Sequence, residues 1–417
     1  MTTDYSNALQ GMEDLASVGM SISFDGVPQN DLVEVTPKQV YLGESLLTPG
    51  LQTSITFDSY IHSVPTKWFD NFKNADVQIS LEKPGINTLR NLGLPTSMNV
   101  LQKVYRLENR HKINNNTERF TLRACDQSQL NDPKTLVSRS WKCATPSEVV
   151  DYVLGICVGS TSRFIETSMY PRDYIAENIH PFQVVSQQAN YAVAEGTDPS
   201  FLHYMTYGDG FDTRPAHHFR SLRSLSQQKP VMQYYFNEVS NTYGDPCSIL
   251  TYKFPCDFDL LTDILNGIDE NGNNINSLIL FDPINKSFSL FNQSFNLFGC
   301  GIGSGVMKMA ISNQNTYQQQ DMCPDYAKDF LQFRQARMSL LAQDKIALRM
   351  TVPFNPVLHA GKTIDVNLYN KETRPDFEFN YGSGRYMILH MFHHIVSGGL
   401  ATTTLDCVSS TVGRGIV

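Results

Sequence analysis

Residues 101–125, LQKVYRLENRHKINNNTERFTLRAC, carry the strongest fold signal in the chain. The run Asn114–Asn116 is typical of a turn, because asparagine tolerates the backbone conformations that turns require. The flanking stretches, Leu101–His111 and Thr117–Cys125, are predicted to pair as an antiparallel hairpin. One face of the second strand is apolar, since apolar and polar residues alternate there with a period of two. The residues on that face are Phe120, Leu122 and Ala124.

The stretches before this hairpin show the same alternation. It runs through Leu51, Thr53, Ile55, Phe57 and Ile61, and again through Val77, Ile79 and Leu81. Pro84 ends the second run, because proline lacks the amide that a sheet ladder needs. Residues 1–30 are polar and without periodicity, which indicates an extended or partly ordered arm. We therefore expect residues 1–125 to form an N-terminal arm and a first β domain.

Helix signals appear after residue 125. Thr145-Pro146-Ser147-Glu148 is a capping box with proline at the first helical position. The apolar stripe that follows it, from Val149 to Leu154, is expected to end at Gly155. A second helix is predicted to begin at Pro181 and to be closed by Gly196, and a strand is predicted at Phe201–Tyr207. We expect residues 126–212 to form a small α/β domain.

Strand patterns return after residue 212. They are predicted at Val231–Phe236, Ser248–Phe254, Ile346–Val352, Ile364–Leu368, Tyr386–Val396 and Thr402–Val408, with a turn at Ser397-Gly398-Gly399. Residues 213–253 and 340–417 are expected to form a discontinuous second β domain. Residues 254–339 are expected to be an inserted α+β domain packed outside it. Within the insertion we predict a helix at Asp257–Leu265, a hairpin of Ser277–Leu280 with Ser287–Phe291, and a helix that Pro324 opens.

Composition narrows the class of protein. A length of 417 residues is typical of two to four domains, and 41% apolar residues exclude a disordered chain. Charged residues make up 18%, against about 25% in an average soluble protein, which favours lasting contact with other proteins. The net charge of 33 − 41 = −8 excludes a basic nucleic-acid binder.

The chain carries no signal for a membrane or for secretion. The longest apolar run, Tyr386–Val396, is broken by three histidines and falls short of the roughly 20 residues of a membrane helix. The N-terminus lacks the basic and apolar regions of a signal peptide, so we expect folding in a cytoplasm and no membrane anchor. The eight cysteines are scattered and are expected to be reduced, buried small hydrophobes.

The histidine clusters do not have the pattern of metal sites. His390 and His394 are expected on one face of a strand and His393 on the other, with no acidic or cysteine residue placed to complete a ligand set. His217 and His218 are adjacent and are expected to point to opposite faces. We interpret all five as packed or hydrogen-bonded histidines.

Other motifs fall short of the chemistry that they resemble. Asp269-x-Asn271-x-Asn273 begins like an EF-hand loop but has Asn274 in place of the glycine and Leu280 in place of the glutamate. Gly301-Ile302-Gly303-Ser304-Gly305 lacks the third glycine of a nucleotide fingerprint. No nucleophile motif is present. We expect no catalytic residue, no cofactor and no metal, and therefore not an enzyme.

Several segments together resemble the central baseplate hub protein of contractile-tailed, T-even-type bacteriophages. The resemblance lies in residues 41–53 (YLGESLLTPGLQT), 145–154 (TPSEVVDYVL), 180–189 (HPFQVVSQQA), 198–202 (DPSFL), 355–366 (NPVLHAGKTIDV) and 384–388 (GRYMI). Their order and spacing extend over most of residues 33–410. The family is related to the hub part of type VI secretion spike proteins.

The resemblance implies a fold of two tube-type antiparallel β-barrel domains, with an α/β domain between them and an insertion in the second. No internal repeat is visible in the sequence, so the duplication rests on the resemblance. It also implies a homotrimer that joins a sixfold tail tube to a threefold central spike, in the virion baseplate, after assembly in the host cytoplasm. Expected partners are a separate central spike protein, tail tube or tube-initiator proteins, a tape-measure protein and baseplate wedge proteins. DNA would pass through the channel without specific binding.

Two alternatives stay open at this stage. One is the hub of a related contractile injection machine, either a tailocin or a type VI secretion system. The other is a tail-associated cell-wall hydrolase, which needs a convergent acid/base or metal site that the sequence does not reveal.

Overall fold

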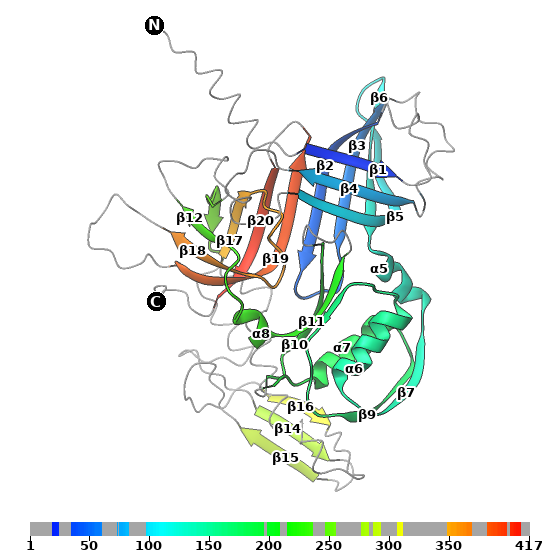
Figure 1. The fold of residues 1–417 in the computed structure, drawn as a ribbon, viewed down its shortest axis with the longest axis vertical. Coiled ribbons are helices and arrows are strands. Elements are labelled where there is room, and N and C mark those ends of the chain that lie inside the picture. The colour runs from blue at the N-terminus through cyan, green and yellow to red at the C-terminus, as the bar shows by residue number, and fades with distance from the viewer. Residues whose placement is uncertain are drawn as a thin grey trace, which may run out of the picture.

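A 12-stranded sheet dominates the structure, a computed structural model (Figure 1). It describes residues 19–24, 35–60, 73, 75–82, 97–195, 198–208, 215–236, 247–255, 277–282, 287–292, 307–311, 348–368, 382–397 and 401–409. The helices predicted at Asp257–Leu265 and from Pro324, and the motifs at Asp269–Asn273 and Gly301–Gly305, lie outside these residues. The fold is mainly β with antiparallel sheets, so the predicted fold class is confirmed.

The N-terminal half of the sheet is built from six strands. They are β1 (Gly19–Phe24), β2 (Val35–Ser45), β3 (Gln52–Tyr60), β4 (Asp76–Glu82), β5 (Ser97–Lys112) and β6 (Thr117–Cys125). They lie in the order β1-β4-β5-β6-β3-β2, and every pair is antiparallel. The predicted hairpin is confirmed as β5 and β6. The arm expected at residues 1–30 is wrong at β1, because Met20 and Ile22 pack against the core and the strand pairs with β4.

The C-terminal half also contains six strands. They are β12 (Gln233–Phe236), β13 (Thr251–Lys253), β17 (Leu348–Pro353), β18 (Thr363–Leu368), β19 (Gly384–Val396) and β20 (Ala401–Val408). The order is β12-β18-β19-β20-β17-β13. The amide of Tyr235 in β12 donates to the carbonyl of Cys247 at 3.0 Å, and the amide of Ile249 donates back to Tyr235 at 2.9 Å. Because these residues lead into β13, the six strands of this half close on themselves, as in a β-barrel.

The two halves repeat one topology. In each, the strands in chain order lie as first, fourth, fifth, sixth, third and second across the sheet. The fifth strand is the longest in both halves, with 16 residues in β5 and 13 in β19. Each fifth strand also carries a register shift against the sixth, between Val104 and Arg106 in β5 and between Ile388 and His390 in β19. One pairing differs, since β1 meets β4 antiparallel whereas β12 meets β18 parallel.

The insertion falls between the second and third strands of the second half. The corresponding connection in the first half, from β2 to β3, takes only residues 46–51. The inserted strands are β14 (Ser277–Asp282), β15 (Ser287–Asn292) and β16 (Met307–Ile311). The predicted hairpin is confirmed as β14 and β15, and β16 adds a parallel strand to it that the sequence pattern did not predict. These strands form a sheet of their own (Figure 1).

An α/β unit separates the halves along the chain (Figure 1). Its elements are α5 (Gln127–Asn131), β7 (Val137–Ala144), α6 (Pro146–Tyr152), β8 (Arg163–Ile165), β9 (Arg172–Ile179), α7 (Pro181–Tyr191), β10 (Phe201–Thr206), β11 (Ala216–Ser221) and α8 (Leu222–Ser226). The predicted capping box is confirmed, since Thr145 accepts from the Glu148 amide and Glu148 from the Thr145 amide. Strand β11 and helix α8 lie beyond residue 212, where the sequence pattern placed the domain boundary. The predicted domain boundaries stay predictions.

Two predicted helix ends are wrong. The chain does not stop at Gly155 but continues through a π-helix, Val153–Cys157, which keeps Val153 and Leu154 buried. Helix α7 ends at Tyr191 and not at Gly196, because Ala192 is extended and packs into the core. In both places tertiary packing outweighs the glycine stop signal.

Candidate functional site

One face of the 12-stranded sheet is polar across both halves. Cα partners in neighbouring strands share a face, and one row of partners runs Arg123, Ser54, Tyr41, His394 and Thr402. A second row runs Gln52, Gly43, Phe392, Thr404, Thr351 and Thr251. We call these residues, together with Gln39, Thr56 and Thr121, the polar sheet face. The opposite face carries the cores, such as Val40, Ile55 and Leu122 in the first half.

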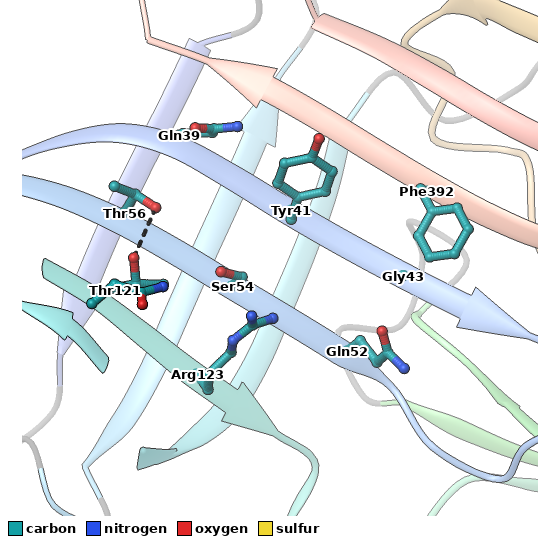
Figure 2. A pocket seen from close by; sticks show the side chains of 10 residues that line it. Gln39, Tyr41, Gly43, Gln52, Ser54, Thr56, Thr121, Arg123 and Phe392 are labelled. Carbon is teal, nitrogen blue, oxygen red and sulfur yellow. Dashed lines mark hydrogen bonds between the residues drawn. The ribbon is translucent and has the colours of Figure 1, made fainter. Parts of the chain in front are cut away.

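The polar sheet face is hollowed over β2, β3 and β6. The hollow has a volume of about 390 Å³ and is lined by residues of both halves. Figure 2 shows Ser54, Thr56, Thr121 and Arg123 on the strands of the first half, with Phe392 of β19 lying over Gly43. The hydroxyls of Thr56 and Thr121 lie 3.3 Å apart across β3 and β6. The surface is therefore built largely of neutral hydroxyl and amide groups.

Charged groups beside this neutral region are paired across neighbouring strands. Arg119 holds Asp58 through two hydrogen bonds of 2.7 and 3.0 Å, which raise the pKa of Arg119. Arg123 donates to Glu108 at 2.5 Å. In the second half, Arg349 donates to both oxygens of Asp406, and its pKa is raised in the same way. These partly exposed pairs add little stability, about 0–1 kcal/mol each, but they balance positive charge against negative charge on the sheet.

The two halves meet where β2 pairs with β19, from His390 opposite Ser45 to Val396 opposite Gln39. Gly43 lets the Phe392 ring pack closely there, because a Cβ at this position would lie 3.1 Å from that ring. The Gln39 side-chain amide lies 2.6 Å from Nε2 of His394 and donates to it. The junction is a packed seam and not a loose contact between domains.

A buried carboxylate ties the three parts of the chain together on the opposite side of β2. Glu44 accepts from the amide of Tyr207 at 2.7 Å and from the amide of Ala360 at 2.7 Å. His359 donates to it through Nδ1 at 2.9 Å. Tyr207 follows β10, and the other two residues lie between β17 and β18. Glu44 therefore joins the first β half to the α/β unit and to the second half.

Four of the five histidines considered as metal ligands, His217, His218, His393 and His394, make polar contacts with other side chains. His390 and His394 face one way and His393 the other, as predicted. His393 is buried, its Nδ1 lies 2.7 Å from the Thr403 hydroxyl, and burial lowers its pKa to about 3. His217 and His218 also point to opposite faces: His217 contacts Ser128 and His203, and His218 contacts Thr206. Within the described residues, no group of three metal-ligating side chains comes together.

A second hollow of about 720 Å³ lies between the α/β unit and the residues before β18. Its one carboxylate, Glu166, accepts from the amide of Ser221 at 2.7 Å and from the hydroxyls of Ser221 and Ser224 at 2.8 and 2.6 Å. Glu166 thereby secures the start of α8, which is a structural role.

The cysteines differ in part from the prediction that all are buried. Cys125 and Cys407 are buried, and burial raises the pKa of the Cys125 thiol to about 12. Cys157 and Cys247 are half-buried. Cys143 is exposed in β7, at a position with a positive φ of 50° beside a register shift. No described helix is long and apolar enough to span a membrane.

The polar sheet face was not predicted from the sequence, although a signal for it exists. The apolar residues of each strand were used to assign the core, and the polar residues between them define the other face. No local pattern predicts that β2 and β19, which are far apart in the chain, pair and bring two such faces together.

No protein-family model and no curated protein matches the sequence. Solved structures do match the fold. A tail protein from Neisseria meningitidis MC58 matches with a TM-score of 0.55 and 7% identity, over 95% of this chain and 98% of that one. The 43 kDa tail protein of prophage MuSo2 from Shewanella oneidensis matches with a TM-score of 0.52 and 8% identity, over 94% and 97%.

A third match is the c3393 protein of E. coli, a component of the type VI secretion system described as similar to T4 bacteriophage tail proteins gp27 and gp5. Its TM-score is 0.50, with 9% identity over 95% of this chain and 78% of that one. The chain therefore has the fold shared by these phage tail and type VI secretion proteins.

Proposed function

We propose that this chain is a structural, non-enzymatic protein of a phage tail, the central hub of a contractile baseplate. Three copies form a ring of six β halves around a channel for DNA, with the polar sheet face toward the channel. The hub joins a sixfold tail tube on one side to a threefold central spike on the other, in contact with tape-measure and wedge proteins. The observation that carries the proposal is the repeated strand order, which supplies two equivalent units per chain.

The chemistry of the polar sheet face supports a channel for DNA. Protein affinity for DNA comes mainly from lysine and arginine that neutralise phosphates. On this face the arginines at positions 119, 123 and 349 are engaged by carboxylates, and the strands between them present hydroxyls and amides. Such a surface would bind the phosphates of passing DNA only weakly.

The experiment combines electron microscopy with size-graded labelling. Micrographs of the purified chain should show rings with a central hole. In a Cys143→Ser background, Gln52→Cys places a thiol at an exposed position of the polar sheet face, and Ser186→Cys places one on the exposed side of α7. A small maleimide should label both variants. A maleimide carried on a long polymer should label Ser186→Cys fully and Gln52→Cys poorly. Equal labelling of both by the polymer would contradict a channel-facing position.

The runner-up is the hub of a type VI secretion spike, which the match to the E. coli secretion component favours. Binding of purified tail tube protein and of purified type VI tube protein to the same ring separates the two. A phage hub should bind only the first.

A further inference from the structure

The second hollow has the features of a site for a small molecule. Its volume of about 720 Å³ lies within the range of about 300–1,000 Å³ that is typical of ligand pockets. Strands β8, β10 and β11 line it from the α/β unit, and residues 359–362 line it from the second half. Glu44 binds both this segment and the residue that follows β10. The hollow therefore lies at a fixed contact between two parts of the chain.

Three aromatic rings lie in a row across the strands of the hollow. His218 of β11 is the Cα partner of Tyr204 in β10 and of Phe164 in β8. Its ring stacks on both, with centroids 4.8 Å from Tyr204 and 5.1 Å from Phe164, and with planes 8° and 16° from parallel. Phe164 ends the stack, because β8 is the edge strand of this sheet among the described residues and Phe164 is 57% exposed. One more planar group can therefore extend the stack.

An arginine without a carboxylate partner lies beside the stack. Arg220 follows His218 by two residues in β11, so the two side chains share one face of the strand. Arg220 is half-buried, and its guanidinium lies 3.5 Å from the carbonyl of Ser224 but forms no ion pair within the described residues. The one carboxylate of the hollow, Glu166, is engaged by serine hydroxyls and an amide. A half-buried guanidinium in this state is suited to bind an oxyanion.

Further polar groups of the hollow favour an anion. Lys362 also lines it. Burial, followed by the nearby cationic or protonatable groups His359, Arg220 and Lys362, lowers the pKa of His218 to about 3. Nδ1 of His218 and Nε2 of His359 have no hydrogen-bond partner within the described residues, although buried polar groups are normally paired. The hollow thus combines two unpaired imidazole nitrogens with an excess of positive charge, which a bound anion would balance.

We propose that this hollow binds a small molecule in which a planar ring is joined to an oxyanion, as in a mononucleotide. The planar ring stacks on Phe164, and the oxyanion binds Arg220 in the field of Lys362. Phe164 and Arg220 lie one strand and two residues apart, which places their Cα atoms about 8 Å from each other, a separation that a base and its phosphate can span. No sequence motif reveals such a site, because only the fold brings β8, β11 and residues 359–362 together. Binding goes beyond the proposed hub function and does not depend on assembly.

Isothermal titration calorimetry of the full-length chain tests the site with adenosine monophosphate, adenosine and inorganic phosphate. Adenosine monophosphate carries both groups and should bind at least about tenfold more tightly than either part alone. Arg220→Gln removes the cation and should weaken its binding at least about tenfold. Phe164→Ala removes an exposed ring and should weaken it at least about fivefold. The matched controls, Arg106→Gln on β5 and Ile175→Ala on β9, change exposed residues far from the hollow in the sequence and should leave binding unchanged.

Each outcome decides for or against the site. Saturable binding of adenosine monophosphate that both site variants weaken and both controls keep supports it. No saturable binding at millimolar concentration overturns it, and so does unchanged binding by Phe164→Ala, which stays decisive even if Arg220→Gln fails to fold because Phe164 is mostly exposed. Equal affinity for phosphate alone or for adenosine alone also overturns it, since one of the two groups would then play no part. The mass of the chain in solution tests the hub separately, so the two failures are distinguishable.

Discussion

Tyr41 and His394 stack ring on ring across the junction of the two β halves, with their centroids 4.4 Å apart and their planes 17° from parallel. They are Cα partners in β2 and β19. The contact makes one continuous surface out of two repeated units. We call this junction of β2 and β19 the seam between the two halves.

Overpacking this seam should destabilise the chain. Gly43→Val adds a Cβ 3.1 Å from the Phe392 ring, and we expect a loss of about 1–3 kcal/mol in the free energy of unfolding by urea. Phe392→Ala in the same chain should restore part of the loss, because it removes the ring that the added side chain meets. Equal losses with and without Phe392→Ala would show that this contact is not the cause.

Removing the negative charge of Glu44 should destabilise the folded protein. In Glu44→Gln an NH2 group that cannot accept replaces one carboxylate oxygen, so at least one of the buried donors, the Ala360 amide or the Tyr207 amide, loses its acceptor. We expect a loss of about 2–4 kcal/mol in unfolding free energy. Glu177→Gln, at an exposed position of β9, is the control and should change stability by less than about 0.5 kcal/mol. If Glu44→Gln also changed the unfolding free energy by less than about 0.5 kcal/mol, the role of Glu44 in joining the three parts of the chain would be contradicted.

Stability should fall in mild acid. Burial lowers the pKa of His217, His218 and His393 to about 3 in the folded chain, whereas an unfolded histidine binds its proton near pH 6.5. Below that pH the unfolded chain binds more protons, so stability is fully present above about pH 6.5 and is lost as the pH falls toward 3. Each such histidine contributes a slope of about 1.4 kcal/mol per pH unit in this window.

The variant His393→Gln isolates one of these groups. Unfolding free energies measured between pH 5.5 and pH 4, where the unfolded histidine is protonated and the folded one is not, should show a slope lower by about 1.4 kcal/mol per pH unit than that of the unchanged protein. His180→Gln, on an exposed side chain, should keep the original slope. If both variants keep the original slope, the neutral, buried state of His393 is wrong.

A charge at the outer edge of β5 should weaken assembly without unfolding the chain. Tyr105 is 52% exposed, so Tyr105→Glu costs little in the monomer, but in the proposed ring it would place a charge where an exposed apolar edge meets the next copy. We expect at least a tenfold weaker association in sedimentation velocity. Ile175→Glu removes an apolar side chain that is 65% exposed on β9 and should leave association unchanged. Equal effects of the two substitutions would contradict an interface at β5.

Local periodicity predicted most of the elements but not their assembly. The alternation at Val77, Ile79 and Leu81 defines β4, and the capping box at Thr145 defines the start of α6, because both signals are local. The repeat stayed hidden because equivalent positions hold chemically unrelated residues, such as Arg106 and His390, which follow the register shifts in β5 and β19. The strand order depends on hydrogen bonds between backbone groups, which do not depend on the side chains. The side chains need only alternate between apolar and polar with a period of two.

The candidate site could not be predicted from the sequence for a related reason. Thr404 and Gln52 belong to the same row of the polar sheet face only because β2 pairs with β19. Such a pairing between distant segments leaves no local pattern. The helix ends at Gly155 and Gly196 were wrong because buried residues around them extend one helix and end the other early.

The mass of the purified full-length chain in solution tests the central claim most directly. Size-exclusion chromatography with multi-angle light scattering should give 3 × 47.0 = 141 kDa, the mass of a ring with six β halves, and dilution should release the 47.0 kDa chain without an intermediate plateau. A stable dimer of 2 × 47.0 = 94 kDa at all concentrations would contradict the hub.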